Sequence, residues 1–239
     1  MPLTFPSHAA AVLPFCWARR RWPRLGSWLD PVALVVGSTA PDLPYLLGWH
    51  GKPAHLPLGL ATWCLPMGMV VYLWWEALVR PAFGLGPARQ AGWGAVALSL
   101  VLGAATHQLW DGFTHNWLWP ATALYPNVMV KIFGIEMYLS KAFQIASSGL
   151  GLAATLAYTW RARSALLPGS WPGAPRLAAL LAPAVAAGAL AGALAARSAA
   201  GSWSKQLWDI GWAAVLWGMA GLALTCGLAR WRRSGVRLI

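Results

Sequence analysis

The chain has 239 residues, of which 58% are hydrophobic and only 10% are charged. A soluble domain usually carries about 25% charged residues, so this composition excludes an ordinary soluble globular protein. The formal net charge of +12 would suit a nucleic-acid binder, but the basic residues lie in short clusters between apolar runs, as they do in membrane proteins. We therefore expect a lipid bilayer, and not a nucleic acid, as the partner of this chain.

Two weakly apolar segments open the chain. Residues 5–17 are too short to cross the roughly 30 Å hydrocarbon core with ease, so they form either a re-entrant or tilted helix or a thin further span. The second segment, residues 31–49, begins with Asp30-Pro31. An aspartate that caps a helix and a proline in its first turn predict a helix that runs toward Pro41-Asp42 or beyond. This second segment is long enough to be a membrane span.

Five clear apolar runs follow, at about residues 56–79, 92–116, 139–160, 177–196 and 207–229. A helix needs about 20 apolar residues to cross the hydrocarbon core. We predict an all-α fold, a polytopic transmembrane helical bundle of about six spans plus a short N-terminal re-entrant or tilted helix.

The predicted bundle divides into two parts. Residues 1–160 form the membrane domain that holds the candidate site, and residues 161–239 add two C-terminal transmembrane helices to the same bundle. Gly188 and Gly192 have the spacing of a GxxxG motif, which predicts close packing of this part of the chain against another helix.

The basic residues indicate how the spans are oriented. If residues 31–49 cross the membrane and the arginines between Arg19 and Arg24 are cytoplasmic, the 18 Lys and Arg residues divide into 13 on the cytoplasmic side and 5 on the other. Cytoplasmic loops of membrane proteins carry the excess of Lys and Arg. We therefore predict that the N-terminal arginine cluster and the C-terminus are both cytoplasmic.

Three polar residues interrupt the apolar run 92–116. His107, Asp111 and His115 stand at i, i+4 and i+8, a spacing that puts them on one face of a helix. Imidazole and carboxylate groups are ligands for zinc and other transition metals, and leaving them unpaired in lipid would cost several kcal/mol. Either a metal ion or hydrogen bonds between helices would satisfy them, and a stripe of three favours the metal.

Other polar residues fall on the same, outer side of the predicted membrane. Asp42 lies toward the outer end of the second segment, His55 lies at the start of the first clear run, and His8 joins them if the first segment enters from the outer surface. We therefore predict that four separate stretches converge on one site. Glu136 either orders the turn into the next span together with Lys141 or supplies a further ligand.

Four ordered motifs are similar to those of a known family. They are the N-terminal stretch 2–14, which contains His8, and the stretches 37–42, 65–68 and 106–115. On these motifs, which cover roughly residues 1–160, the chain resembles the bacterial membrane family called domain of unknown function 4184. That family is similar in motif order to predicted membrane-bound metal-dependent hydrolases, which are grouped distantly with zinc phospholipase C and single-strand-specific nucleases.

The resemblance implies a metal site in a protein of the bacterial cytoplasmic (inner) membrane. The implied ligands are His8, Asp42, His55, His107, Asp111 and His115. The implied cofactor is a divalent metal ion, for which zinc is one candidate. The chain departs from the family pattern at two places, since Ala54 and Leu56 flank His55 where hydroxyl-bearing residues are expected, and Cys64 stands where an acidic residue is expected.

Our leading hypothesis is a metal-dependent hydrolase at the outer face of the membrane that acts on a phosphoester in an amphiphilic or lipid-linked substrate. Either Asp42 or Asp111 would serve as the base, or the metal would activate the water, so these two aspartates are the candidate catalytic residues. The rival hypothesis is a non-enzymatic polytopic membrane protein, a metal-binding, transport or assembly component, in which the same His/Asp cluster binds an ion or holds helices together.

Overall fold

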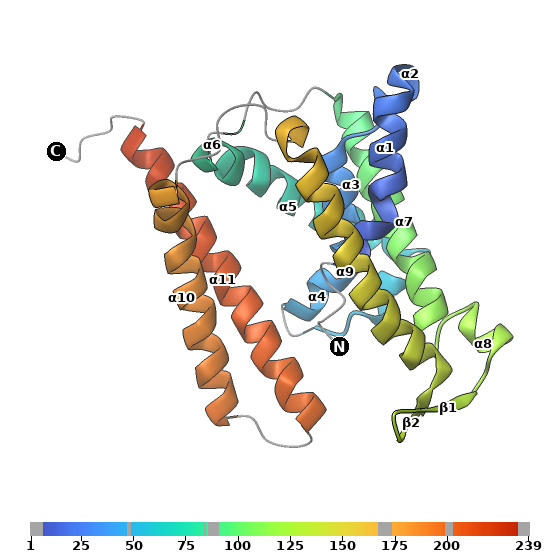
Figure 1. Ribbon diagram of the computed structural model, residues 1–239. Coiled ribbons are helices and arrows are strands. Elements are labelled where there is room, and N and C mark those ends of the chain that lie inside the picture. Colours follow the sequence, from blue (N-terminus) through green and yellow to red (C-terminus); the bar gives the residue numbers. More distant parts are fainter. Residues whose placement is uncertain are drawn as a thin grey trace.

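The computed structural model describes residues 7–46, 49–83, 85, 91–166, 174–198 and 203–233, and it is mostly helical (Figure 1). The prediction of an all-α fold is confirmed. Within these residues the strands form one short hairpin, β1 (Met129–Ile132) and β2 (Ile135–Tyr138). Its turn places Phe133 at φ 49° and Gly134 at φ 81°, the left-handed backbone that tight hairpin turns require. The hairpin lies in a stretch for which the sequence predicts only a loop.

The N-terminal segments form short helices separated by breaks. The described chain begins with the 3-10 helix η2 (Ser7–Val12) and continues as α1 (Leu13–Arg21) and α2 (Pro23–Gly26). It then returns as α3 (Pro31–Gly37), η3 (Ala40–Asp42) and α4 (Leu43–Leu46). Asp30 caps α3 as predicted, because its Oδ1 accepts a hydrogen bond from the backbone N–H of Ala33 at 2.9 Å.

Contrary to the prediction, the helix that begins after Asp30 does not run toward Pro41-Asp42 or beyond. Helix α3 ends at Gly37, where the hydroxyls of Ser38 and Thr39 donate to carbonyls one turn earlier (2.8 and 2.9 Å). Such side-chain bonds compete with helix continuation, and Pro41 disfavours helical backbone in the residue before it. The seven residues of α3 rise only about 10 Å, so this helix is too short to cross a bilayer by itself.

The five clear apolar runs each form a long helix, as predicted. One continuous helix, Leu60–Phe83, comprises the π-helical turn η5 (Leu60–Cys64), α5 (Leu65–Trp74), the π-helical turn η6 (Trp75–Val79) and α6 (Arg80–Phe83). The others are α7 (Trp93–Thr114), α9 (Leu139–Leu166), α10 (Ala174–Ser198) and α11 (Trp203–Arg233). Short helices η4 (Lys52–His55) and α8 (Ala121–Leu124) lie in the connections.

One of these helices has a composition that suits a membrane span by itself. In the described part of the chain, Leu60–Phe83 is the one helix that is both long and apolar enough to cross a bilayer.

Small residues let the helices approach closely. Where α3 meets α7, a Cβ atom on Gly103 would lie 2.3 Å from the carbonyl oxygen of Leu34 and 2.8 Å from the nitrogen of Ser38. The absence of a side chain at Gly103 therefore fixes the end of α3 against the middle of α7. A Cβ atom on Gly188 of α10 would lie 2.6 Å from the carbonyl oxygen of Ala214 on α11, so the close packing predicted for the GxxxG motif is confirmed.

The remaining contacts place the N-terminal helix and the C-terminal pair. Helix η2 lies between α7 and α9 and contacts both. Helix α11 packs on the Leu60–Phe83 helix through Cys226, Val79 and Ala82, all of which are buried. The N-terminal turn that carries His8 is thereby held beside the polar face of α7.

Candidate metal centre

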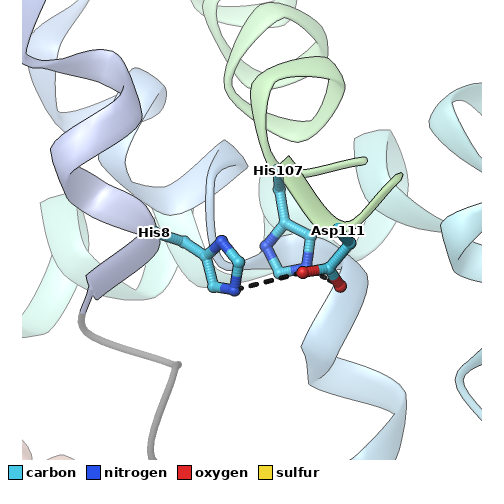
Figure 2. A group of neighbouring side chains, drawn as sticks. All are labelled: His8, His107 and Asp111. Carbon is cyan, nitrogen blue, oxygen red and sulfur yellow. Dashed lines mark ion pairs between the residues drawn. The ribbon is translucent and has the colours of Figure 1, made fainter. Parts of the chain in front are cut away.

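Five of the six predicted ligand residues lie together in the interior. His8 comes from η2, Asp42 from η3, His55 from η4, and His107 and Asp111 from one face of α7. Each is at most 9% exposed, and His107 is fully buried. Figure 2 shows His8 and His107 side by side, with Asp111 next to His107 on the side away from His8 and on the same helix as His107. Residues from four separate elements are thus brought into one cluster.

Four atoms of this cluster face one another at distances that suit a metal ion. Asp111 Oδ2 lies 3.2 Å from both His55 Nε2 and His107 Nε2. Asp42 Oδ1 lies 3.5 Å from His55 Nε2 and 3.8 Å from His107 Nε2. Charge-assisted hydrogen bonds are shorter, about 2.7–2.9 Å, whereas atoms bound about 2.0–2.1 Å from a tetrahedral zinc ion lie about 3.3–3.4 Å apart. The ligand atoms of two groups, His8 with His107 and Asp111, and Asp42 with His55 and His107, lie within 4.8 Å of one another and could hold a metal ion. Asp42, Asp111, His55 and His107 could together supply a four-ligand shell.

Backbone carbonyls orient the two histidines of this shell. His107 Nδ1 lies 2.8 Å from the carbonyl oxygen of Ser38, and His55 Nδ1 lies 2.8 Å from that of Gly51. A carbonyl only accepts, so each Nδ1 carries the proton and each Nε2 is available as a ligand. His107 Nε2 is buried and has no hydrogen-bond partner. A buried nitrogen without a partner costs free energy, and a bound metal would remove that cost.

His8 and His115 contact the other oxygen of Asp111. His8 Nε2 and His115 Nδ1 each lie 3.5 Å from Asp111 Oδ1, and the ring of His8 stacks on that of His107 with 3.9 Å between centroids. Contrary to the prediction, His115 is not on the helix, because α7 ends at Thr114 and His115 has extended backbone. It reaches Asp111 from the edge of the site, where its side chain is 26% exposed.

The two carboxylates determine the charge of His55, which lies before the Leu60–Phe83 helix. Burial lowers the pKa of His55, but the carboxylates of Asp111 and Asp42 outweigh it and raise this pKa to about 10. The metal-free ring is therefore protonated at neutral pH. Since a metal binds only the neutral ring, metal binding releases this proton and weakens as the pH falls.

Gln108 and Cys64 support the segment that carries His55. Gln108 Nε2 donates to the carbonyl oxygens of Ala54 and Leu56, both at 2.9 Å, and the Cys64 thiol donates to the Ala54 carbonyl at 3.4 Å. These bonds hold the loop at the positions where the family pattern leads one to expect hydroxyl or acidic side chains. Gln108 directly follows His107 in an apolar helix. Its polar side chain could therefore have been recognised from the sequence as part of the site.

Replacing Gln108 with leucine should weaken zinc binding by about 10–100-fold, because groups that orient metal ligands typically contribute that much to metal affinity. The Gln108→Leu variant loses both bonds to the His55 segment. Competition against a fluorescent zinc chelator measures the affinity. Leu109→Ala, at a 59% exposed position of the same helix, is the control and should bind as the wild type does. Equal affinity of the two variants would show that Gln108 does not support the site.

A pocket of about 370 Å³ adjoins the site at His115. Gln144 Nε2 lies 3.3 Å from His115 Nε2, and Lys141 Nζ donates to Gln144 Oε1 at 2.5 Å. The other walls of the pocket are mostly apolar and include Trp117, Met129, Met137 and Tyr138. Glu136 also lines this pocket and is exposed on β2, opposite Lys131 of β1. The structure therefore places Glu136 at the pocket and not among the buried ligands.

A family model described as "Domain of unknown function (DUF4184)" matches residues 1–226. The match includes all six predicted ligands and extends from the N-terminus into α11. No curated protein and no solved structure matches the chain.

Proposed function

The chain belongs to the DUF4184 family, and from its buried His/Asp centre we propose that it is a membrane-embedded, metal-dependent hydrolase of a phosphoester in an amphiphilic or lipid-linked substrate. The observation that carries the proposal is the fully buried Nε2 of His107, which makes no hydrogen bond and faces the carboxylates of Asp111 and Asp42 at 3.2 and 3.8 Å. Two imidazoles and two carboxylates form a donor set that fits zinc and related divalent ions.

The two aspartates have different roles in this proposal. The contacts of Asp42 with the histidines use Oδ1, so its Oδ2 can take the proton from an attacking water. Asp111 uses both oxygens, one toward each pair of histidines, and serves as a ligand. A divalent metal supplies Lewis-acid polarisation of the phosphoryl oxygen and acidifies a bound water. Asp42 is thus the proposed general base.

Several features support a membrane location for the helices. Large apolar side chains face outward on α9, α10 and α11, among them Leu150 (73% exposed), Val185 (68%) and Leu224 (64%). Contiguous exposed apolar surface is rare on soluble monomers and suits lipid. Helices α7, α9, α10 and α11 contain 22, 28, 25 and 31 residues, and about 20 residues suffice to cross a bilayer.

The proposed orientation puts the site near the outer face of a bacterial inner membrane. In Figure 1, α2, α6 and the C-terminal ends of α9 and α11 lie toward the upper side, and the β1–β2 hairpin lies toward the lower side. The upper elements carry arginines at their ends, such as Arg24, Arg80 and Arg161, so this side is proposed to be cytoplasmic. The site lies in the C-terminal half of α7, the half nearer the hairpin.

Lys141 is the proposed contact for the negative charge of the substrate. Lys141→Ala should raise KM for a phosphodiester about tenfold with little change in kcat, because a hydrogen bond to a charged group contributes about 1.5–3 kcal/mol. Steady-state kinetics in detergent measure both constants. Lys131→Ala, on the exposed face of β1, is the matched control. A loss confined to kcat would contradict a binding role for Lys141.

Hydrolysis itself tests the proposal. The purified, zinc-loaded protein should hydrolyse bis(p-nitrophenyl) phosphate, and a chelator should remove this activity until metal is restored. Protein that binds metal but hydrolyses neither this ester nor a phospholipid would be a metal-binding or transport component instead.

A further inference from the structure

The carboxylate of Asp111 lies between two separate pairs of histidines. Its Oδ2 faces His55 and His107 at 3.2 Å, and its Oδ1 faces His8 and His115 at 3.5 Å. A carboxylate used in this way, with one oxygen toward each set of nitrogens, has the arrangement of a bridging ligand between two ions.

The first set of ligands is complete without His8 and His115. Asp42 Oδ1, His55 Nε2, His107 Nε2 and Asp111 Oδ2 supply four atoms, which is the number that a tetrahedral ion binds. His8 is nevertheless only 3% exposed and its Nδ1 has no hydrogen-bond partner. Figure 2 shows its Nε2 pointing at Asp111. The Nε2 of this buried histidine, and not its Nδ1, is placed to bind an ion beside Asp111 Oδ1.

We propose that Asp111 bridges two divalent metal ions. The second ion is held by His8 Nε2, Asp111 Oδ1 and His115 Nδ1, and its remaining coordination position opens toward the pocket beside His115. Binding through His115 Nδ1 requires the amide of Gln144 to turn, so that its oxygen accepts from the N–H at His115 Nε2. Three protein ligands and one open position are typical of catalytic metal sites, and a closed four-ligand shell is typical of structural ones. This inference rests on the proposed function and assigns substrate contact to the second ion.

The charge of a two-ion centre indicates the class of its substrate. The cluster contains two carboxylates, Asp42 and Asp111, beside neutral histidine ligands. One divalent ion would leave the centre neutral, whereas two leave an excess positive charge that an anionic phosphoester balances. Pairs of metal ions stabilise both the attacking and the leaving oxygen of such esters. A substrate with a phosphate group is therefore the class that this centre would attract.

Metal stoichiometry tests the second ion. The full chain in detergent is saturated with Mn²⁺, freed of excess metal, and analysed by elemental mass spectrometry and electron paramagnetic resonance. We expect about two ions per chain in the wild type, with exchange coupling between them, and about one uncoupled ion in His8→Phe. Phenylalanine keeps a ring stacked on His107 but offers no ligand. His50→Ala, at an exposed loop position, should keep both ions.

The outcomes separate this inference from the proposed function. One uncoupled ion per chain in both the wild type and His8→Phe would overturn the second site, and hydrolysis of the phosphodiester by that one-ion protein would keep the proposed function. Absence of bound metal from the wild type would overturn both. Thermal unfolding of each variant in the same detergent checks that a lost ion does not reflect a lost fold.

Discussion

Asp111→Asn should release the bound metal and lower phosphodiester hydrolysis by at least about 100-fold, since a metal contributes several kcal/mol to the transition state and each 1.4 kcal/mol is about tenfold in rate. Asparagine has nearly the shape of aspartate but lacks the charge and one of the two anionic oxygens. Those oxygens contact all four neighbouring histidines, His8, His55, His107 and His115. No other single change removes so many ligand contacts.

Elemental analysis and the hydrolysis of bis(p-nitrophenyl) phosphate measure the two effects of Asp111→Asn. Glu76→Gln is the matched control, because Glu76 pairs with Arg80 at 2.8 Å on the Leu60–Phe83 helix and not with the cluster. It should keep metal content and rate close to those of the wild type. If Asp111→Asn kept its metal and its rate, Asp111 would not be a ligand.

Gly103→Ala should destabilise the protein by about 1–3 kcal/mol and also weaken metal binding, because overpacking a close contact costs about that much. The added methyl would lie 2.3 Å from the Leu34 oxygen and 2.8 Å from the Ser38 nitrogen, and backbone atoms cannot turn aside as a side chain does. Helix α3 must therefore shift away from α7. The Ser38 carbonyl that holds His107 would move with it.

Gly94→Ala, on the same helix, is the matched control. It distinguishes the effect of the close contact from the effect of alanine on helix stability. A Cβ atom there meets nothing within 4 Å, and alanine favours a helix by about 1 kcal/mol over glycine. This variant should be as stable as the wild type or more so, with unchanged metal affinity. Thermal unfolding in detergent and chelator competition measure both properties. Equal stability of the Gly103→Ala and Gly94→Ala variants would contradict the close contact between α3 and α7.

The long helices were predictable from the sequence because hydrophobicity extends over many residues in each of them. The break after α3 was not, since it depends on hydroxyl groups of Ser38 and Thr39 that bond back to the preceding turn. The β1–β2 hairpin was missed for a similar reason. Phe133 adopts a left-handed backbone beside Gly134, and a phenylalanine gives little sign of that turn.

Part of the candidate site could be predicted from the sequence. The spacing of His107 and Asp111 in an apolar run predicts their shared face, and the two residues do share one face of α7. The groups that orient the histidine ligands could not be predicted, because the backbone carbonyls of Ser38 and Gly51 have no sequence signature. Gln144 was visible as a polar residue in an apolar span, but its contact with His115 depends on how α9 packs.

The metal content of the purified protein tests the central claim most directly. The full chain, extracted in detergent without chelators and analysed by elemental mass spectrometry, should carry at least about one divalent ion per molecule, as a four-ligand shell requires. His107→Ala should carry none above background, and His50→Ala should match the wild type. A wild-type protein with no more metal than His107→Ala, both folded, would contradict the assignment of this cluster as a metal centre.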